Sequence, residues 1–262
     1  MKLVWLSDPH FEAGGVKVAG HDPAERLSAA IAHINQHHSD AANCVISGDL
    51  VNNGSIEGYR AMSDLLSRLE VPVLPMVGNH DDRKAVRSVL SLPVDCMENF
   101  VQYSVGDNEF ELLCLDSQKE GADAGYFCGD RFAWLETQLN RFKDKQICLF
   151  MHHPPVDLGL PMQDKDKMEN GEAFLEFIKN HSNVVHLFVG HVHRPISGQV
   201  NGISFTTMRS VLIQAPPPIP HWDWGSFVPA KEAPAMGIIT LSKRSVIVQF
   251  EQFCGYEVGT GG

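Results

Sequence analysis

The stretch "VGHVHRP", residues 189–195, places two histidines two positions apart, directly after the apolar run "VVHLF". Side chains on one face of a helix are three or four positions apart, so this spacing does not fit a helix. Gly190 and the closing proline indicate a loop. The stretch therefore predicts a buried strand over 184–189 that ends in a loop carrying His191 and His193.

Four other apolar runs end in the same way. They cover residues 2–6, 43–47, 73–77 and 147–151, and they lead into "SDPH", "SGDLVNNG", "VGNHDD" and "MHHPP". In open α/β sheets, functional side chains gather at the carboxyl ends of the strands. We therefore expect the polar residues of these five loops to meet at one site.

These loops hold a chemically coherent set of donors. Four imidazoles, two carboxylates and one amide suit first-row divalent cations. Seven donors exceed what one ion with an open position needs, whereas two ions sharing a carboxylate accommodate them. The sequence thus predicts two divalent transition-metal ions (Mn, Fe, Co or Zn). The predicted ligands are Asp8, His10, Asp49, Asn79, His152, His191 and His193.

The rest of the chain alternates helical and strand patterns. Helices are predicted over 24–37, 56–69, 82–90, 130–142 and 171–180, and further strands over 111–115, 196–200, 203–207, 236–241 and 245–250. Asp22 and Pro23 suit the N-cap and first turn of the first helix, and Asn170 the N-cap of the last. This order predicts layered α/β sheets flanked by helices, in a single domain over 1–262.

Composition narrows the class of partner. Thirty-two acidic and 21 basic residues give a formal net charge of −11, which argues against binding a nucleic-acid polymer. A small anionic substrate stays compatible, because bound cations would dominate the local field. No run reaches the roughly 18 apolar residues of a membrane span. Six cysteines without a C-x-x-C pair, three of them in apolar runs, indicate a reduced, cytoplasmic protein.

The motif series D-x-H, G-D, G-N-H-D, H and G-H-x-H spans residues 8–193 and resembles the calcineurin-like metallophosphoesterase superfamily. "GNHDD", "MHHPP" and the later "ENG" are most similar to the bacterial class III cyclic-nucleotide phosphodiesterases and glycerophosphodiesterases. The resemblance implies a four-layer α/β/β/α sandwich of two mixed sheets flanked by helices. It also implies a dinuclear centre in which Asp49 bridges the two ions. The first ion would take Asp8, His10, Asp49 and His193, and the second Asp49, Asn79, His152 and His191.

The implied activity is hydrolysis of small phosphodiesters, either glycerophosphodiesters or cyclic nucleotides, by attack of a metal-bound hydroxide. Two divalent ions, two carboxylates and a hydroxide leave a charge of about +1, which suits a monoanionic diester. A phosphomonoesterase of broad specificity is the alternative. A non-catalytic, metal-free scaffold is a distant one, because every ligand position is filled. Asn52 replaces the tyrosine of purple acid phosphatases, so no ferric-tyrosinate centre is expected.

Three further residues are predicted to act near the substrate. His80 follows a ligand, so we expect it to contact substrate together with Asn79, and to protonate the leaving alkoxide or stabilise the transition state. Asp81 is predicted to orient His80. His153, next to a ligand, is expected either to support the site from behind or to touch substrate.

Other segments carry weaker expectations. The loops 155–171 and 215–224 are predicted to shape specificity. Segment 208–214 has no counterpart of the histidine that some relatives carry for substrate. Tail 245–253 is hydrophobic and suggests either a paired sheet edge or the interface of a homo-oligomer. The histidines in and just after the first predicted helix, His33, His37 and His38, are expected to be ordinary surface or core residues.

Overall fold

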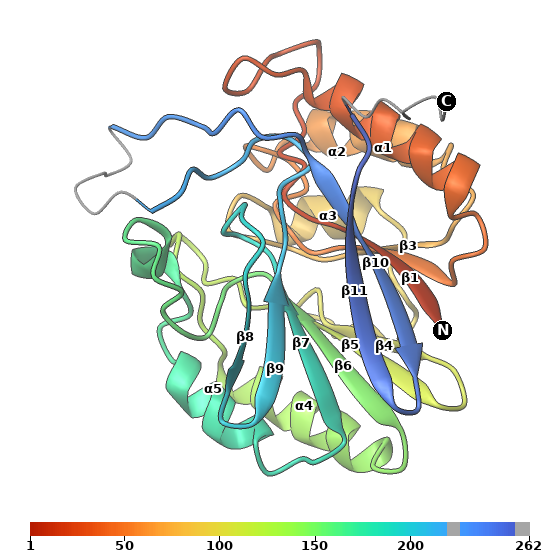
Figure 1. The fold of residues 1–262 in the computed structure, drawn as a ribbon, viewed down its shortest axis with the longest axis vertical. Helices are drawn as coiled ribbons and strands as arrows, with labels where there is room; N and C mark the ends of the chain where they lie inside the picture. The colour runs from red at the N-terminus through yellow and green to blue at the C-terminus, as the bar shows by residue number, and fades with distance from the viewer. Residues whose placement is uncertain (219–225, 255–262) are drawn as a thin grey trace, which may run out of the picture.

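The computed structural model describes residues 1–218 and 226–254, which form two mixed sheets (Figure 1). The first sheet has the order β11 (Ser245–Gln252), β10 (Ala235–Ser242), β1 (Lys2–Leu6), β2 (Asn43–Ile46), β3 (Val73–Pro75). The second has the order β4 (Tyr103–Gly106), β5 (Phe110–Leu115), β6 (Gln146–Met151), β7 (Val184–Val189), β9 (Ile203–Thr207), β8 (Ser197–Val200).

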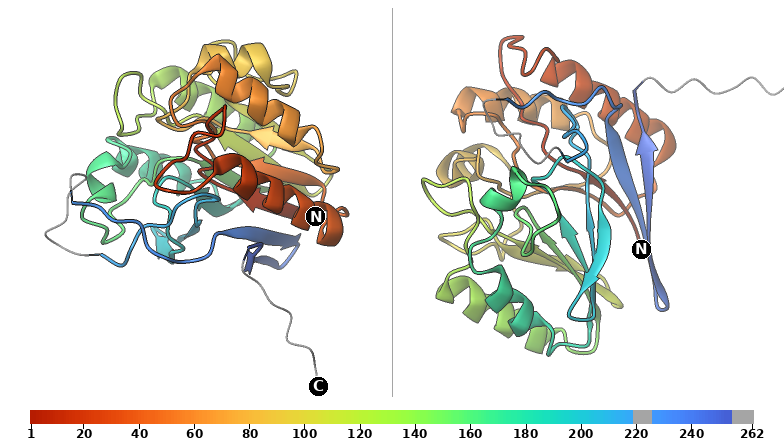
Figure 2. Two further views of the ribbon diagram at one scale, coloured as in Figure 1. Left: turned by 90° about the horizontal axis from the view of Figure 1, so that it is seen from above. Right: turned by 60° about the vertical axis from the view of Figure 1, so that its left-hand side comes forward.

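Helices cover the outer face of each sheet (Figures 1 and 2). α1 (Pro23–His37), α2 (Ile56–Leu66) and α3 (Arg83–Val89) lie on the first sheet, and α4 (Gly129–Arg141) and α5 (Gly171–Ile178) on the second. The predicted fold class, two mixed sheets between helical layers, is confirmed. Among the described residues, no helix combines the length and the apolar character needed to cross a bilayer.

Aromatic packing joins the two sheets. The Trp5 ring on β1 meets Phe150 and Phe188 on the second sheet edge-on, with centroids 6.3 and 5.2 Å apart. The two phenylalanines stack at 4.5 Å. Alternate residues of β6 point the other way, as Leu149 and Met151 pack among the side chains of α4 and α5. Both faces of this sheet are therefore buried, which explains why its central strands read as continuous apolar runs.

Strand direction brings the motif loops together. β1, β2 and β3 run parallel in one sheet, and β6 and β7 run parallel in the other. Their carboxyl ends meet at one side of the molecule. The fold therefore delivers all five motif loops to a common place.

The structure corrects several element boundaries. β3 ends at Pro75 rather than at 77, and α2 ends at Leu66 rather than at 69. β4 and a 3-10 turn at Gln163–Asp166 were not predicted. Asn170 occupies the N-cap position of α5, but its side chain bonds the backbone of Phe127 instead of capping the helix. Of the predicted loop 215–224, residues 219–224 lie outside the described residues.

Candidate dinuclear metal centre

All seven predicted metal ligands converge where the five loops meet. They come from the loops after β1 (Asp8, His10), β2 (Asp49), β3 (Asn79), β6 (His152) and β7 (His191, His193). Four are buried and three are half-buried, and each of the seven has a donor atom within 4 Å of a donor atom of another. Their roles as metal ligands stay predictions.

Asp49 lies between two groups of donors. Its Oδ2 is 3.6 Å from His10 Nε2 and 3.3 Å from His152 Nε2. In the first group, His193 Nε2 is 3.4 Å from Asp8 Oδ1 and 3.1 Å from His10 Nε2. One carboxylate thus faces imidazoles on both sides, as a bridging ligand must.

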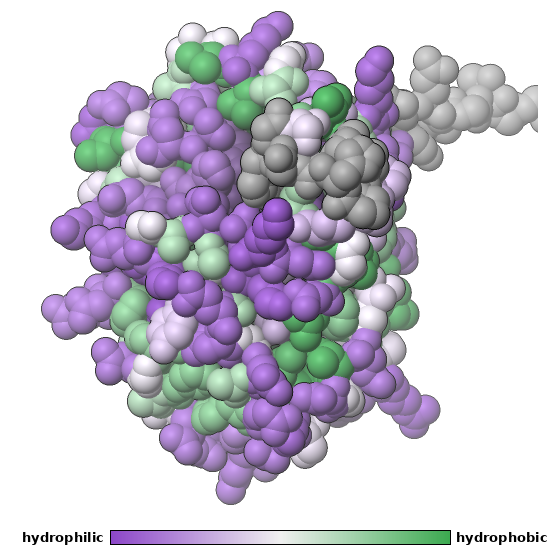
Figure 3. All heavy atoms as spheres, turned by 90° about the vertical axis from the view of Figure 1, so that its left-hand side faces the viewer, coloured by the Kyte–Doolittle hydropathy of each residue, from purple (hydrophilic) through white to green (hydrophobic). Residues whose placement is uncertain are grey.

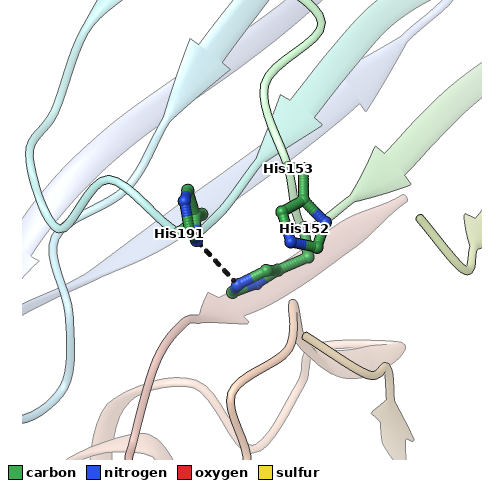
Figure 4. Close-up of side chains that lie close together, drawn as sticks. All are labelled: His152, His153 and His191. Carbon is green, nitrogen blue, oxygen red and sulfur yellow. Dashed lines mark hydrogen bonds between the residues drawn. The ribbon is translucent and has the colours of Figure 1, made fainter. Parts of the chain in front are cut away.

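The second group is built around His152. Its Nε2 lies 3.2 Å from Asn79 Oδ1 and 3.3 Å from His191 Nδ1, and Figure 4 shows the two rings pointing toward one another. His152 Nδ1 donates to the carbonyl of Ser47 at 2.8 Å. That bond directs Nε2 toward the other donors, as expected of a metal-binding histidine.

The donor set fits two cations. Imidazole lone pairs and carboxylate and amide oxygens face one another at 3.1 to 3.6 Å. Such acceptors repel unless a proton or a cation lies between them. The nitrogen-rich composition of the cluster suits first-row transition metals better than Ca²⁺ or Mg²⁺.

The backbone of the ligand loops is strained. Five of the seven predicted ligands adopt positive φ values: Asp8 (52°), His10 (41°), Asp49 (49°), His191 (68°) and His193 (51°). Each costs on the order of 1–3 kcal/mol for a non-glycine residue. Bonds between the loops hold these turns, since His10 N–H donates to the Asp49 carbonyl and His191 N–H to the Asp8 carboxylate. The strain concentrates at the site.

Gly78 is required by close approach. A Cβ at this position would lie 2.2 Å from Asp49 Oδ1 and 2.6 Å from His152 Nε2. Any side chain here would displace two predicted ligands. The glycine of "GNHD" therefore serves packing against the metal centre.

Charge and burial set the protonation of the donors. Burial raises the pKa of Asp49, but the charge of His152 outweighs it and holds that pKa well below its usual range. Burial lowers the pKa of His152, but the Asp49 carboxylate raises it to about 9. Burial lowers the pKa of His10 to about 4 and that of His191 to about 3. These last two imidazoles are neutral at pH 7, the form that binds a metal ion.

His80 lies at the mouth of the site, and Asp81 does not orient it. His80 Nδ1 donates to the carbonyl of Asn52 at 2.7 Å, so its other ring nitrogen, Nε2, is the one that can serve a substrate. The Asp81 carboxylate instead accepts hydrogen bonds from the Tyr59 hydroxyl and from backbone N–H groups of the loops after β2 and β3. Burial raises the pKa of Asp81 to about 7, and the Asp49 charge adds to that shift. The predicted role of Asp81 in orienting His80 is therefore wrong, and its carboxylate instead links the loops that follow β2 and β3.

His153 lies behind the second group of donors. Its side chain is fully buried, and Figure 4 shows it beside His152 and His191. Ser117 Oγ is 2.8 Å from its Nδ1, and the Asp123 carbonyl is 3.1 Å from its Nε2. Both ring nitrogens are thus engaged. This position matches the supporting role rather than contact with substrate.

A cavity of about 340 Å³ opens over the donors. Its walls include six of the predicted site residues: His10, Asp49, Asn79, His80, His191 and His193. Sequence analysis missed several other wall residues: Asn52, Asp123, Gln163, Asp166, Ile213, Ala215 and Phe227. Three of these lie in the predicted specificity loops. Ala215 belongs to 215–224, and Gln163 and Asp166 belong to 155–171, where a 3-10 turn places positions i and i+3 on the same face.

The comparisons with known proteins agree with this site. The chain belongs to the calcineurin-like phosphoesterase family, whose model matches residues 1–195. It is similar to a probable cyclic nucleotide phosphodiesterase of Rhodopseudomonas palustris, with 39% identity over 82% of this chain and 79% of the relative. It is also similar to the glycerophosphodiester phosphodiesterase GpdQ of Enterobacter lignolyticus, with 31% identity over 82% of this chain and 79% of that protein.

Solved structures support the fold. A dimetal phosphatase from Danio rerio superimposes with a TM-score of 0.73 at 16% identity, over 96% of both chains. A purple acid phosphatase from yellow lupin seeds matches with a TM-score of 0.66 at 17% identity, over 98% of this chain and 52% of that one. At these identities the likeness concerns the fold alone.

Proposed function

We propose that this chain is a phosphodiesterase that hydrolyses small phosphodiesters with two divalent transition-metal ions. The observation that carries the proposal is the Asp49 carboxylate, which lies between His10 and His152 at 3.6 and 3.3 Å. Two relatives that are more than 30% identical are named for cyclic nucleotide and glycerophosphodiester hydrolysis. The shared chemistry of both names is a small phosphodiester.

The donors divide into two sets around the bridge. Asp8, His10, Asp49 and His193 would hold the first ion, and Asp49, Asn79, His152 and His191 the second. When bound, two such ions supply Lewis acidity to the phosphoryl oxygens and lower the pKa of a water between them. Mn²⁺, Fe²⁺, Co²⁺ and Zn²⁺ all suit this nitrogen and oxygen set.

Charge favours a diester over a monoester. Asp8 and Asp49 offset only part of the positive charge of two divalent ions, and the remainder complements the single negative charge of a phosphodiester. The cavity above them is about 340 Å³, room for a small ligand rather than a polymer groove. A monoester dianion would be matched less well.

His80 is placed to serve the leaving group. Its Nδ1–H bonds the Asn52 carbonyl, so Nε2 is the ring nitrogen that can serve a substrate, and the ring lines the cavity. A proton on Nε2 can pass to the departing alkoxide, or hydrogen-bond a phosphoryl oxygen. The amide oxygen of Asn79 lies 3.2 Å from His152 Nε2. The His153 ring packs against the rings of His152 and His191 and so positions them.

Parallel assays of bis(p-nitrophenyl) phosphate and p-nitrophenyl phosphate test the reaction class. The proposal predicts turnover of the diester well above that of the monoester. Preferred hydrolysis of the monoester would favour a phosphomonoesterase, and no hydrolysis of either by fully metal-loaded protein would favour a scaffold. A panel of glycerophosphocholine, glycerophosphoethanolamine, 3′,5′-cAMP and 2′,3′-cAMP, run with each metal separately, then identifies the substrate.

A further inference from the structure

A second cluster of metal-binding side chains lies away from the five motif loops. At the end of α1, His33 Nε2 is 2.6 Å from Glu251 Oε1 of β11, and His38 Nε2 is 3.3 Å from the same carboxylate. The ring of His37 lies 4.6 Å from that of His33. Figure 2 shows β11 passing alongside α1. The sequence interpretation of these histidines as ordinary residues did not foresee this grouping.

We propose that His33, His38 and Glu251 form a separate site that binds one Zn²⁺ ion. Their three ligand atoms all lie within 4.8 Å of one another. Two imidazole nitrogens, one carboxylate oxygen and an open fourth position are a ligand set that zinc accepts. The site shares no residue with the candidate dinuclear centre.

The present geometry is close to what an ion requires. A tetrahedral zinc with bonds of ~2.0 Å holds its ligand atoms roughly 3.3 Å apart. The His38–Glu251 separation of 3.3 Å already matches, whereas the His33–Glu251 separation must open from 2.6 Å. The Glu251 side chain is 35% exposed and can rotate. His37, four residues after His33 on the same helix face, can supply the fourth donor, and water can do so otherwise.

The electrostatic setting favours a cation. The carbonyls at the end of α1 carry partial negative charge. Burial raises the pKa of Glu251, but the hydrogen bonds from His33 and His38 outweigh it and lower that pKa, so the carboxylate is ionised. The nearby amine of Lys2 pairs with Asp40 instead.

A bound ion would tie α1 to the edge strand of the first sheet. Because an ion that binds only the folded chain stabilises it, Zn²⁺ should raise the melting temperature through this cluster. That effect is independent of phosphodiester hydrolysis. Because Zn²⁺ at the candidate dinuclear centre would also raise the melting temperature, the readout is the difference between the wild type and variants of this cluster.

The test is the number of Zn²⁺ ions retained per chain, measured by inductively coupled plasma mass spectrometry. The double variant His33→Ala/His38→Ala should retain one ion fewer than the wild type, and its melting temperature should rise less with Zn²⁺. His181→Ala, a histidine outside every described metal-type cluster, is the matched control and should behave like the wild type. Turnover of bis(p-nitrophenyl) phosphate should be unchanged in all three proteins.

Glu251→Gln provides a second variant that keeps an oxygen acceptor for His33, so it preserves the fold if the double variant does not. It too should lose one ion. Equal zinc content and equal thermal shifts in wild type, Glu251→Gln and His181→Ala would overturn the proposal. Because the result is a difference between variants, it does not depend on whether the dinuclear centre performs the proposed hydrolysis.

Discussion

The floor and the rim of the cavity are built in different ways. The floor consists of the seven predicted ligands, which sit on strained turns at strand ends and are tied together by backbone hydrogen bonds. The rim consists of Asp123, Gln163, Asp166, Ile213 and Phe227, which come from connecting segments outside the strands and helices that carry the motif loops. Figure 3 shows the face of the molecule on which these loops lie, where hydrophilic side chains predominate.

This difference suggests two roles: the floor residues carry out the reaction, and the rim residues select among substrates. Floor residues are fixed by two sheets and by each other, so a change there should affect every substrate. Rim residues are held by local contacts. For example, the Asp164 carboxylate, between Gln163 and Asp166 in the chain, accepts hydrogen bonds from the backbone N–H groups of Leu158 and Leu160. A change in the rim should alter the preference among substrates and leave the reaction intact.

The largest effect is expected at the bridge. Asp49→Asn removes the charge that both ions share, while the amide oxygen can still accept the His80 N–H bond. We expect kcat/KM for bis(p-nitrophenyl) phosphate to fall at least ~10⁴-fold, since each ion supplies several kcal/mol of transition-state stabilisation. Metal content should fall with it. An Asp49→Asn variant that keeps both ions and full turnover would contradict the assignment of Asp49 as the bridging ligand.

His80→Ala separates leaving-group assistance from metal chemistry. Loss of a general acid should cost about 10²- to 10³-fold in kcat on a diester with an alkoxide leaving group. The loss should be much smaller for p-nitrophenolate, which leaves without a proton. Metal content should stay that of the wild type. His21→Ala, a histidine outside the cavity wall, is the control, and an equal loss on both substrates would argue against the assigned role.

Tyr59→Phe tests whether Asp81 supports the floor as a structural tie. The hydroxyl donates to the Asp81 carboxylate at 2.7 Å and accepts from Asp82 N–H at 2.9 Å. Removing a hydrogen bond to a buried carboxylate should lower the free energy of unfolding by about 1–3 kcal/mol, as read from urea denaturation. Tyr126→Phe, at an exposed tyrosine, should change it little. Equal stability of the two variants would contradict this role.

The smallest effect is expected at the rim. Asp166 is half-buried on the cavity wall, and its carboxylate should attract a substrate with a cationic head group. Asp166→Asn should therefore lower kcat/KM for glycerophosphocholine relative to 3′,5′-cAMP by about 2- to 5-fold, equivalent to up to ~1 kcal/mol. Asp157→Asn, in the same loop but paired with Lys167 outside the cavity wall, is the control. An unchanged ratio of the two kcat/KM values would show that Asp166 does not contribute to substrate preference.

The floor residues could be predicted from the sequence because the motifs that identify them are local. An apolar run followed by glycine and a donor residue, as in "GNHD", identifies both the strand and the site at its end. The family resemblance then added the layered fold. The role of Asp81 could not be reached, because its partners Tyr59, Leu50 and Val51 lie more than twenty residues away in the chain.

The rim could not be predicted residue by residue. Asp123 lies on the cavity wall because its backbone carbonyl meets His153, a contact that no spacing in the sequence encodes. The loop 155–171 was expected to shape specificity, but only folding shows that Gln163 and Asp166 are the two that reach the cavity. Similarly, His33 in α1 and His38 just after it gain their partner Glu251 from a strand more than two hundred residues later.

The central claim is that seven donors hold two ions around Asp49, and anomalous X-ray scattering from Mn²⁺-loaded or Zn²⁺-loaded crystals tests it most directly. The account predicts two anomalous peaks roughly 3.5–4 Å apart, both within bonding distance of the Asp49 carboxylate. A single peak, or two peaks of which one lies beyond the reach of Asp49, would contradict it.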